Sequence, residues 1–281
     1  MYVKAYAKIN AYLDVKSKRE DGYHDLDMVM LPLELHDSIQ ISFLPFSKDS
    51  YITCDHVELQ ETKYNLINLT IAEMKKRYKI KDSFSVVVHK EIPISAGLGG
   101  GSSNAAATIR AINQLCKLNL SDEEKINLGK SLGADVPFCL DNVPARVGGI
   151  GENLKPFKLK KKYHVIIIKP EQGLSTKKVF EYADTLELDH GNGDLVEEAL
   201  VNGDDELLAK SVFNSLEKAS INLVNKIQDI KDMFYKDGLK IVLMSGSGSA
   251  VFALTDNRAL AHKLYKKYEK DGHDVYLTKT L

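Results

Sequence analysis

A period of two in the apolar positions predicts strands at the start of the chain. Apolar and polar residues alternate over residues 3–14 and again over residues 25–33. The same alternation returns at Ile39, Ile41 and Phe43. Because successive side chains of a strand point to opposite faces, this pattern is typical of half-buried strands. We therefore expect the chain to open as a sheet, with a strand in each of these segments.

Helical spacing follows these strands. Residues 65–78 favour a helix, and the apolar run at residues 84–90 favours a strand that ends before Pro93. A helix with apolar residues at positions 109, 112 and 116 then follows directly on a glycine-rich segment, Gly97-Leu98-Gly99-Gly100-Gly101-Ser102-Ser103. The sequence therefore predicts a strand, a glycine-rich loop and a helix N-terminus in direct succession.

A capping signature predicts the next helix. Ser121 and Glu124 have the spacing of a capping box, in which each side chain accepts a hydrogen bond from the other residue's backbone. Apolar spacing continues to Gly133, which is suited to end the helix. Asp135 is therefore expected just beyond a helix end.

The glycines and the basic run between residues 144 and 162 predict a loop or hairpin. No internal repeat or low-complexity tract interrupts the chain. We therefore place the boundary between two domains in this segment, with one domain at residues 1–155 and the other at residues 156–281.

The second half of the chain alternates strand and helix patterns. A stripe of apolar residues at Leu223, Ile227, Ile230 and Phe234 predicts one helix that ends at Gly238. The same patterns predict the remaining elements, which are strands at residues 163–169, 239–244, 250–254 and 274–278 and a helix at residues 258–270.

Composition and charge exclude several classes of function. The chain has 281 residues, and 38 Lys and Arg against 39 Asp and Glu leave a net charge of −1, too small to gather nucleic acid or an anionic membrane. No apolar run approaches the ~18 residues that cross a bilayer, and the N-terminus has the pattern of a strand rather than of a signal peptide. We therefore expect no nucleic-acid or membrane partner, while the oligomeric state stays open.

The cysteines and histidines favour a reducing compartment and no metal held by the protein. Cys54, Cys116 and Cys139 form an odd, widely spaced set without a C-x-x-C pair, which favours free thiols in the cytoplasm. The eight histidines lack the paired spacing of zinc ligands. We expect neither a disulfide framework nor a structural zinc site.

The glycine-rich segment is a candidate phosphate site. Glycines let backbone N–H groups approach an anion, and a following helix presents roughly +0.5 charge at its N-terminus. The spacing matches neither a Walker A motif nor G-x-G-x-x-G, because the third glycine of the latter would fall at Ser102. A flexible turn between strand and helix is the alternative interpretation.

Other candidate residues have an ordinary structural explanation when taken singly. The segment Ser245-Gly246-Ser247-Gly248-Ser249 can place backbone donors beside phosphates or simply close a hairpin. Lys8 lies between apolar neighbours, where a lysine at a strand edge commonly reaches solvent. Asp135 fits a solvated or capping carboxylate, and Tyr23-His24 fits a hairpin turn. No one of them decides the function.

Taken together, these segments resemble the GHMP small-molecule kinases. The matching motifs follow in chain order over nearly the full length and are Ala7-Lys8-Ile9-Asn10, Asp21-Gly22-Tyr23-His24, the glycine-rich segment, Gly133-Ala134-Asp135-Val136-Pro137-Phe138 and Ser245-Gly246-Ser247-Gly248. The glycine-rich segment identifies only the family. The first, second and fourth motifs together point to the branch whose substrate carries a diphosphocytidyl group and leads to isoprenoid precursors. The chain departs from this pattern at Ala11 and Ser249-Ala250, which concerns local packing and the shape of the last loop.

The resemblance implies an α+β fold of two domains with the active site in the cleft between them. It implies that Lys8 and Asp135 face the acceptor hydroxyl, with Asn10 nearby. The glycine-rich segment from Gly97 to Ser103 would bind the phosphates of ATP, and Asn65 and Lys90 would lie at the adenine.

The resemblance also implies the site for the cytosine base. Tyr23 would stack on the base and His24 would form a hydrogen bond to it, opposite the aromatic ring of Phe180. Thr176 belongs to the same implied substrate site. ATP with Mg²⁺ is the implied cofactor, and a small cytidyl compound is the implied partner.

Two other classes of function stay open at this point. A GHMP kinase that acts on mevalonate, homoserine or a sugar would keep the loops but has no need of Asp21-Gly22-Tyr23-His24. A nucleotide-binding regulator without enzymatic activity would tolerate the loss of Lys8 or Asp135. A panel of substrates with and without the cytidyl group separates these hypotheses.

Overall fold

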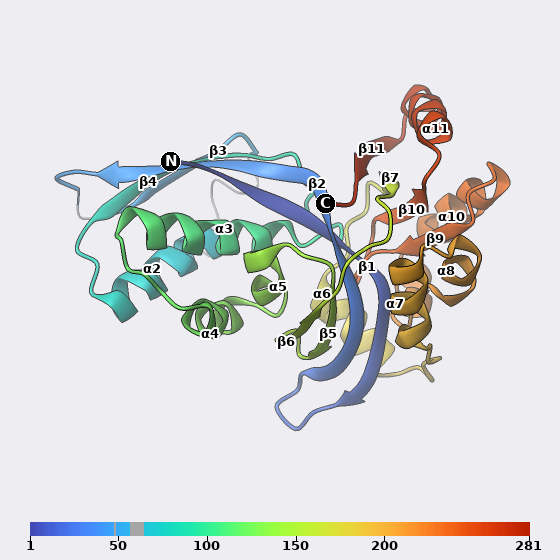
Figure 1. Ribbon diagram of the computed structural model, residues 1–281, viewed down its shortest axis with the longest axis horizontal. Coiled ribbons are helices and arrows are strands. Elements are labelled where there is room, and N and C mark those ends of the chain that lie inside the picture. Colours follow the sequence, from blue (N-terminus) through green and yellow to red (C-terminus); the bar gives the residue numbers. More distant parts are fainter. Residues whose placement is uncertain (48, 57–64) are drawn as a thin grey trace. The chain divides into compact units, whose positions relative to one another are not determined.

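The computed structural model describes residues 1–47, 49–56 and 65–281 (Figure 1). Its strands are β1 (Tyr2–Lys18), β2 (His24–Leu44), β3 (Tyr51–Cys54), β4 (Ser83–His89), β5 (Ala145–Gly149), β6 (Asn153–Pro156), β7 (His164–Lys169), β8 (Phe213–Asn214), β9 (Ile241–Met244), β10 (Val251–Thr255) and β11 (Asp274–Lys279). Its helices are α2 (Leu66–Tyr78), α3 (Gly100–Leu115), α4 (Asp122–Leu132), α5 (Val136–Asp141), α6 (Thr176–Ala183), α7 (Gly193–Asn202), α8 (Asp205–Ser211), α9 (Glu217–Leu223), α10 (Lys226–Lys236) and α11 (Arg258–Lys270). Helices and strands in two sheets confirm the predicted fold class.

The chain divides into two compact units that alternate along the sequence. The first unit consists of Met1–Ala7, Leu35–Ile92 and Gly99–Asn142, and the second consists of Lys8–Glu34, Pro93–Leu98 and Val143–Leu281. Strands β1 and β2 and the glycine-rich segment therefore contribute residues to both units. The boundary that we placed between residues 155 and 156 stays a prediction.

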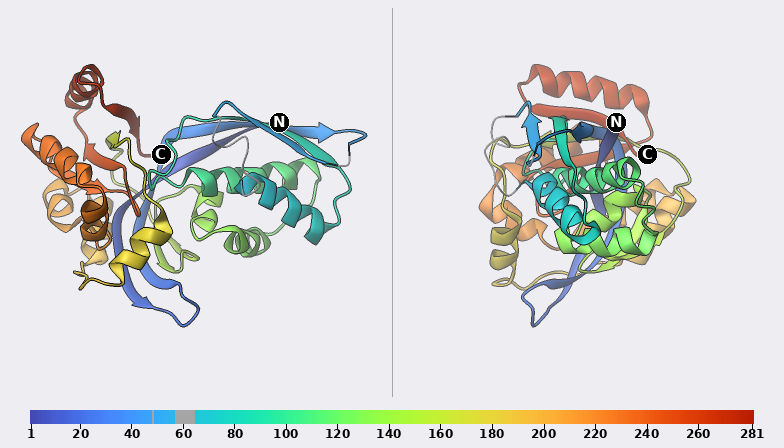
Figure 2. Two further views of the ribbon diagram at one scale, coloured as in Figure 1. Left: turned by 180° about the vertical axis from the view of Figure 1, so that it is seen from behind. Right: turned by 90° about the vertical axis from the view of Figure 1, so that its left-hand side faces the viewer.

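The first unit is a layer of strands covered on one face by helices. Strand β4 pairs antiparallel with β2, and β3 pairs parallel with β4. Helices α2, α3, α4 and α5 lie on one face of these strands, with α3 in contact with the other three (Figures 1 and 2). Alternate residues of β2 and β4 supply the strand side of the core, and the buried members are Ile39, Ile41, Phe84, Val86 and Val88. The period of two therefore works as predicted, because one face of each strand is buried under helices.

A four-stranded antiparallel sheet forms the centre of the second unit. Its strand order is β11-β7-β10-β9, and each neighbouring pair is antiparallel. Helix α10 contacts β9 and β10, and α11 contacts β7 and β11. The predicted strand pair at residues 239–254 and the helix at residues 258–270 are confirmed.

The second unit also contains a hairpin formed by β5 and β6. The two strands pair antiparallel, and β5 pairs in turn with β2 from Leu26↔Gly149 to Met30↔Ala145. Strand β8 adds to β1 in parallel at Tyr12↔Phe213. The segment between residues 144 and 162 is therefore a hairpin, which is one of the two structures that its glycines predicted.

Two predictions of element boundaries are wrong in detail. Residues 25–33 and 39–43 belong to one strand, β2, because the extended backbone continues through Pro32 and Leu33, where Leu33 forms a bridge to Thr280. Leu223 is the last residue of α9 and is 38% exposed, so the buried stripe of α10 begins at Ile227. The spacing of apolar residues continues across the break between α9 and α10, which a periodic pattern does not reveal.

Among the residues that the structure describes, no helix combines the length and the apolar character needed to span a bilayer. Cys54, Cys116 and Cys139 form no disulfide with one another.

The predicted capping box of α4 is present and gives a test of local stability. Ser121 Oγ accepts from the backbone N–H of Glu124 at 3.2 Å, and Glu124 Oε2 accepts from the N–H of Ser121 at 2.8 Å. We expect Ser121→Ala to lower the free energy of unfolding by about 1 kcal/mol, because it removes a helix cap. Denaturant unfolding measures the change. Ser121→Thr keeps the hydroxyl and should lower the free energy of unfolding much less. Equal decreases in the two variants would contradict the role of the cap.

Candidate active site

The glycine-rich segment ends at the N-terminus of helix α3 in the first unit. Gly99 is the N-cap residue with a left-handed φ of 70°, and α3 begins at Gly100 without an acidic residue in its first turn. The Ser103 hydroxyl donates to the carbonyl oxygen of Tyr6 at 2.6 Å and holds this turn against β1. Backbone N–H groups at a helix start have no partner within the helix and favour an anion. This end of α3 therefore has the character that phosphate binding requires.

Glycine at the start of α3 lets neighbouring groups approach the helix closely. A Cβ at Gly100 would lie 3.3 Å from Lys90 Nζ, and one at Gly101 would lie 3.4 Å from Leu66. The Lys90 ammonium therefore lies beside the first turn of α3. Leu66 is the residue after Asn65, so the start of α2 lies at the same place.

Lys90 and Asn65 also have structural partners. The Lys90 ammonium forms an ion pair with Asp37, whose buried carboxylate also accepts from the N–H groups of Glu91 and Ile92 at 2.9 Å. Asn65 Oδ1 accepts from Ile67 N at 2.9 Å and caps helix α2. These contacts fix both residues in place, and their roles at the adenine stay predictions.

Asp135 lies at the N-cap position of helix α5. Its side chain makes no capping hydrogen bond to that helix. A Cβ at Gly133, two residues earlier, would lie 3.8 Å from Ser102 Oγ. The segment that carries Asp135 therefore runs next to the first turn of α3 within the first unit.

Lys8 is a buried residue of the second unit and does not reach solvent. Its side chain is 3% exposed, and its ammonium donates to Asn10 Oδ1 at 2.8 Å. Asn10 in turn donates from Nδ2 to the sulfur of Met28 at 3.3 Å. The backbone N–H of Lys8 donates to the carbonyl oxygen of Leu98 at 3.0 Å, in the glycine-rich segment. The interpretation of Lys8 as an ordinary edge lysine is therefore wrong.

The second glycine loop, Ser245–Ser249, lies against Lys8 and Gly97. It joins β9 to β10, so the hairpin interpretation holds. A Cβ at Gly246 would lie 3.3 Å from Lys8 Nζ and 3.5 Å from Asn10 Oδ1. The Ser245 hydroxyl donates to the carbonyl oxygen of Gly97 at 3.0 Å. The second unit thus brings together Lys8, Asn10, Gly97 and this loop.

Asn214 fixes the conformation of the Ser245–Ser249 loop and was not found by sequence analysis. It is 4% exposed, and its Nδ2 donates to the carbonyl oxygens of Met244 at 2.9 Å and Gly246 at 2.8 Å. The Ser247 hydroxyl lies 2.9 Å from the hydroxyl of Thr176. Asn214 lies in the two-residue strand β8, which is too short to give a periodic signal, so only the fold reveals this contact.

The residues predicted to hold the base lie at the start of β2 and on α6. The rings of His24 and Phe180 are in contact, with centroids 4.8 Å apart and an angle of 31° between their planes. Tyr23 is 61% exposed, whereas His24 is 9% exposed. The predicted pair of His24 and Phe180 is therefore adjacent, with an exposed tyrosine beside it in the sequence.

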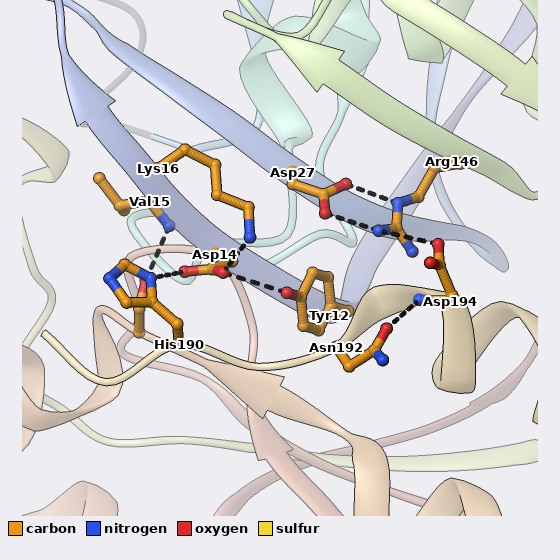
Figure 3. Close-up of polar contacts among 10 residues, drawn as sticks. Tyr12, Asp14, Val15, Lys16, Asp27, Arg146, His190, Asn192 and Asp194 are labelled. Atoms are coloured by element: carbon orange, nitrogen blue, oxygen red, sulfur yellow. Dashed lines mark hydrogen bonds and ion pairs between the residues drawn. The ribbon is translucent and has the colours of Figure 1, made fainter.

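A polar network continues along the face of β1 that carries Lys8 and Asn10 (Figure 3). Asp14 is fully buried and accepts from the hydroxyl of Tyr12 at 3.1 Å and from the ammonium of Lys16 at 2.6 Å. Its other oxygen lies 2.9 Å from Nδ1 of His190, which follows α6 in the chain. Burial opposes ionisation, but the hydrogen bonds from Lys16, His190 and Tyr12 outweigh it, and the pKa of Asp14 lies below its usual value.

Arg146 completes this network beside Tyr12. Its guanidinium forms a two-point ion pair with Asp27, with both N–O distances at 2.5 Å, and lies 5.2 Å from the centre of the Tyr12 ring (Figure 3). A Cβ at Gly193 would lie 2.1 Å from Arg146 Nη1, so the start of α7 packs directly on the guanidinium. The network therefore secures β1 to β5 and α7, close in sequence to Lys8 and Asn10.

Gly97 provides a test of the close contact between the two glycine segments. A Cβ there would lie 2.0 Å from Ser245 O, whereas a Cβ at Gly238, which also has a left-handed φ, would meet nothing within 4 Å. We expect Gly238→Ala to lower the free energy of unfolding by about 1 kcal/mol and Gly97→Ala to lower it by a further ~2 kcal/mol because of the clash. Denaturant unfolding compares the two, and equal losses would contradict the contact.

The buried carboxylate of Asp14 predicts a dependence of stability on pH. Because its pKa is lower in the folded chain than in the unfolded chain, Asp14 stabilises the fold above the unfolded value of ~3.9, and this contribution disappears as the pH falls through the folded value. We expect Asp14→Asn to be less stable than the natural chain at neutral pH, with a difference that shrinks below pH ~4. Denaturant unfolding over this range measures it. The exposed Glu187 is the control, and Glu187→Gln should show little difference at either pH.

Comparison with known proteins shows the family of this chain. The N-terminal domain of the GHMP kinases matches residues 65–145, and their C-terminal domain matches residues 196–274. The chain is 35% identical over 282 residues to the 4-diphosphocytidyl-2-C-methyl-D-erythritol kinase of Clostridium acetobutylicum, covering 100% of both chains. It is 38% identical over 282 residues to the enzyme of that name from Caldicellulosiruptor saccharolyticus, covering 100% of this chain and 97% of the relative.

Solved structures agree with these relatives. A crystal structure of 4-(cytidine 5'-diphospho)-2C-methyl-D-erythritol kinase matches with a TM-score of 0.81 and 28% identity, covering 100% of this chain and 99% of that one. Homoserine kinase from Cytophaga hutchinsonii matches with a TM-score of 0.75 at 18% identity, covering 100% of this chain and 94% of that one, which shows the shared fold. The chain therefore belongs to the GHMP kinase family, in the branch that contains the 4-diphosphocytidyl-2-C-methyl-D-erythritol kinases.

Proposed function

We propose that this chain transfers the γ-phosphoryl group of ATP to the 2-hydroxyl of 4-diphosphocytidyl-2-C-methyl-D-erythritol. The products are ADP and the 2-phosphate, and the reaction belongs to the non-mevalonate route to isoprenoid precursors. The observation that carries the proposal is a buried Lys8–Asn10 pair at the glycine-rich segment, in a chain similar over its full length to kinases of this name. Its three cysteines form no disulfide, which fits the cytoplasm, where we place it.

ATP would bind through its phosphates at the start of α3. The segment from Gly97 to Ser103 supplies backbone N–H groups and the positive end of the helix, which together neutralise phosphate oxygens. Lys90 lies beside the same turn, where its ammonium is paired with Asp37. Asn65 and Lys90 would then orient the adenine.

Magnesium would arrive with ATP. Among residues 1–47, 49–56 and 65–281, no group of three or more His, Cys, Asp and Glu side chains could hold a metal ion. The phosphates would supply most of the oxygen ligands that Mg²⁺ prefers, and the Ser102 hydroxyl at the start of α3 is a suitable protein oxygen. When bound, the ion offsets negative charge on the phosphates.

Lys8 and Asp135 would act on the acceptor side of the reaction. Phosphoryl transfer depends mainly on alignment and on cancelling charge, so a protein has little covalent work to do. Lys8, desolvated beside Gly246, would offset charge near the reacting oxygen, and Asn10 holds its ammonium in place. Asp135 would orient the hydroxyl or accept its proton. The two residues belong to different units, and their convergence on one hydroxyl in a cleft is part of the proposal.

The cytidyl group would bind at the start of β2. Tyr23 would cover one face of the cytosine, while His24 and Phe180 hold the base from the other side. Thr176 would contact the substrate from the start of α6, next to the Ser245–Ser249 loop. These contacts would favour the diphosphocytidyl compound over a plain alcohol.

An ADP-release assay on a substrate panel tests the proposed function. We expect turnover with 4-diphosphocytidyl-2-C-methyl-D-erythritol and none above background with mevalonate or homoserine. If the chain turns over an alcohol that lacks the cytidyl group and does not turn over the cytidyl compound, its substrate is another one of those used within the same family. ATP binding without turnover of any substrate would favour a regulator.

Asp135 gives the mutational test of the acceptor side. We expect Asp135→Ala to lower kcat by ~10²–10⁴-fold, the usual contribution of a positioned acid or base, because the acceptor hydroxyl loses its proton acceptor or orienting group. ATP affinity should stay within a few fold, which calorimetry measures. The control is Asp141→Ala at the exposed end of α5, which should keep full turnover. A parallel loss of nucleotide binding in Asp135→Ala would show that this residue serves ATP instead.

A further inference from the structure

Helix α6 holds the ring of His24 at two points. Phe180 contacts one face of the ring, and Asp184, the C-cap residue four positions later, lies with Oδ1 2.7 Å from His24 Nε2. Residues four apart on a helix lie on the same face, so one short helix supplies both contacts. The His24 side chain is 8% exposed, and its orientation is therefore set by these two neighbours.

A carboxylate at the end of a helix is unfavourable unless something compensates for it. The helix dipole places about −0.5 charge at this end and repels an anion. Lys18 Nζ lies 2.5 Å from Asp184 Oδ2 and supplies the compensation together with His24. Burial opposes ionisation of Asp184, but the hydrogen bonds from Lys18 and His24 outweigh it, so the pKa of this carboxyl lies below its usual value.

An ionised carboxylate can only accept hydrogen bonds, so the nitrogen of His24 that faces it carries hydrogen. In a neutral imidazole the other nitrogen is then an acceptor. Cytosine presents an amino group, a donor, where uracil presents a carbonyl oxygen, an acceptor. A histidine whose Nδ1 accepts can therefore pair with cytosine and is mismatched with uracil.

We propose that Asp184 is a positioning residue that fixes the proton of His24 on Nε2, so that Nδ1 accepts from the amino group of cytosine and selects cytosine against uracil. This inference rests on the proposed function, because it takes His24 as the residue that reads the base. Asp184 itself does not contact the base. Lys18 keeps the carboxylate in place from the side opposite to His24.

Nitrogen-15 NMR of the full chain with labelled histidine reads the proton position directly and without substrate. His24→Gln assigns the ring signals by their disappearance. At pH ~8, above the ordinary histidine pKa of ~6.5, we expect a protonated Nε2 and an unprotonated Nδ1. Asp184→Leu should give a mixture of the two neutral forms, whereas Glu187→Leu, the matched control that removes an exposed carboxylate three residues further along, should keep the form of the natural chain. A natural chain with its hydrogen on Nδ1, or with both nitrogens protonated, would overturn the proposal.

Calorimetry with cytidine 5′-diphosphate and uridine 5′-diphosphate reads the consequence for specificity. We expect Asp184→Leu to reduce the preference for the cytidine compound about tenfold, the usual effect of losing one aligned hydrogen bond. Tyr23→Leu should weaken both nucleotides by a similar factor and keep the ratio, because the stacking assigned to Tyr23 does not distinguish the two bases. An unchanged ratio in Asp184→Leu would contradict the inference alone. No binding of cytidine 5′-diphosphate to the natural chain would contradict the proposed base site as well.

Discussion

The backbone of the glycine-rich segment meets the Ser245–Ser249 loop at a distance that no side chain tolerates. At Gly97 a Cβ would lie 2.0 Å from the carbonyl oxygen of Ser245, and the Ser245 hydroxyl donates to Gly97 O at 3.0 Å. The next residue, Leu98, accepts from the backbone N–H of Lys8 at 3.0 Å. Glycine is therefore needed here for packing, apart from its proposed role at the phosphates, and the surroundings of Lys8 depend on this junction.

Burial of Lys8 is the main consequence of that junction. The loop that covers Gly97 also covers the Lys8–Asn10 pair, and an ammonium away from water acts more strongly on nearby charge than one at the surface. The first unit supplies the other parts of the proposed machinery, which are the start of α3, Lys90 and Asp135. The substrate base is assigned to a third place, at His24, where helix α6 fixes the ring.

Local patterns predicted much of the fold, although they did not predict helices α5 to α9 or strands β3 and β8. They also marked several groups that could carry chemistry. Periods of two and 3.6 located the strands and helices because one face of each is buried, and the Ser121–Glu124 capping box was visible as a spacing. The break between α9 and α10 was missed because the apolar spacing runs across it. Lys8 taken alone was wrongly interpreted as a strand-edge lysine that reaches solvent, because the loop that buries it lies more than two hundred residues away in the sequence.

Residues that act on other residues could not be found in the same way. Asn214 holds the Ser245–Ser249 loop, Asp14 joins β1 to His190, and Asp184 holds His24, each through a contact between segments that are distant in the sequence. A single asparagine or aspartate has no periodicity and no motif, so its partner appears only when the chain has folded. The resemblance to a family names the groups at the substrate, and the structure adds those that orient them.

The most direct test of the account is a crystal structure of the chain with 4-diphosphocytidyl-2-C-methyl-D-erythritol and a non-hydrolysable ATP analogue. We predict that Lys8 Nζ and an Asp135 carboxylate oxygen each lie about 2.6–3.2 Å from the 2-hydroxyl oxygen or are joined to it through one water. We also predict that the γ-phosphate lies between that hydroxyl and the start of α3. Either side chain pointing away from the hydroxyl, or phosphates bound far from Gly99–Ser103, would contradict it.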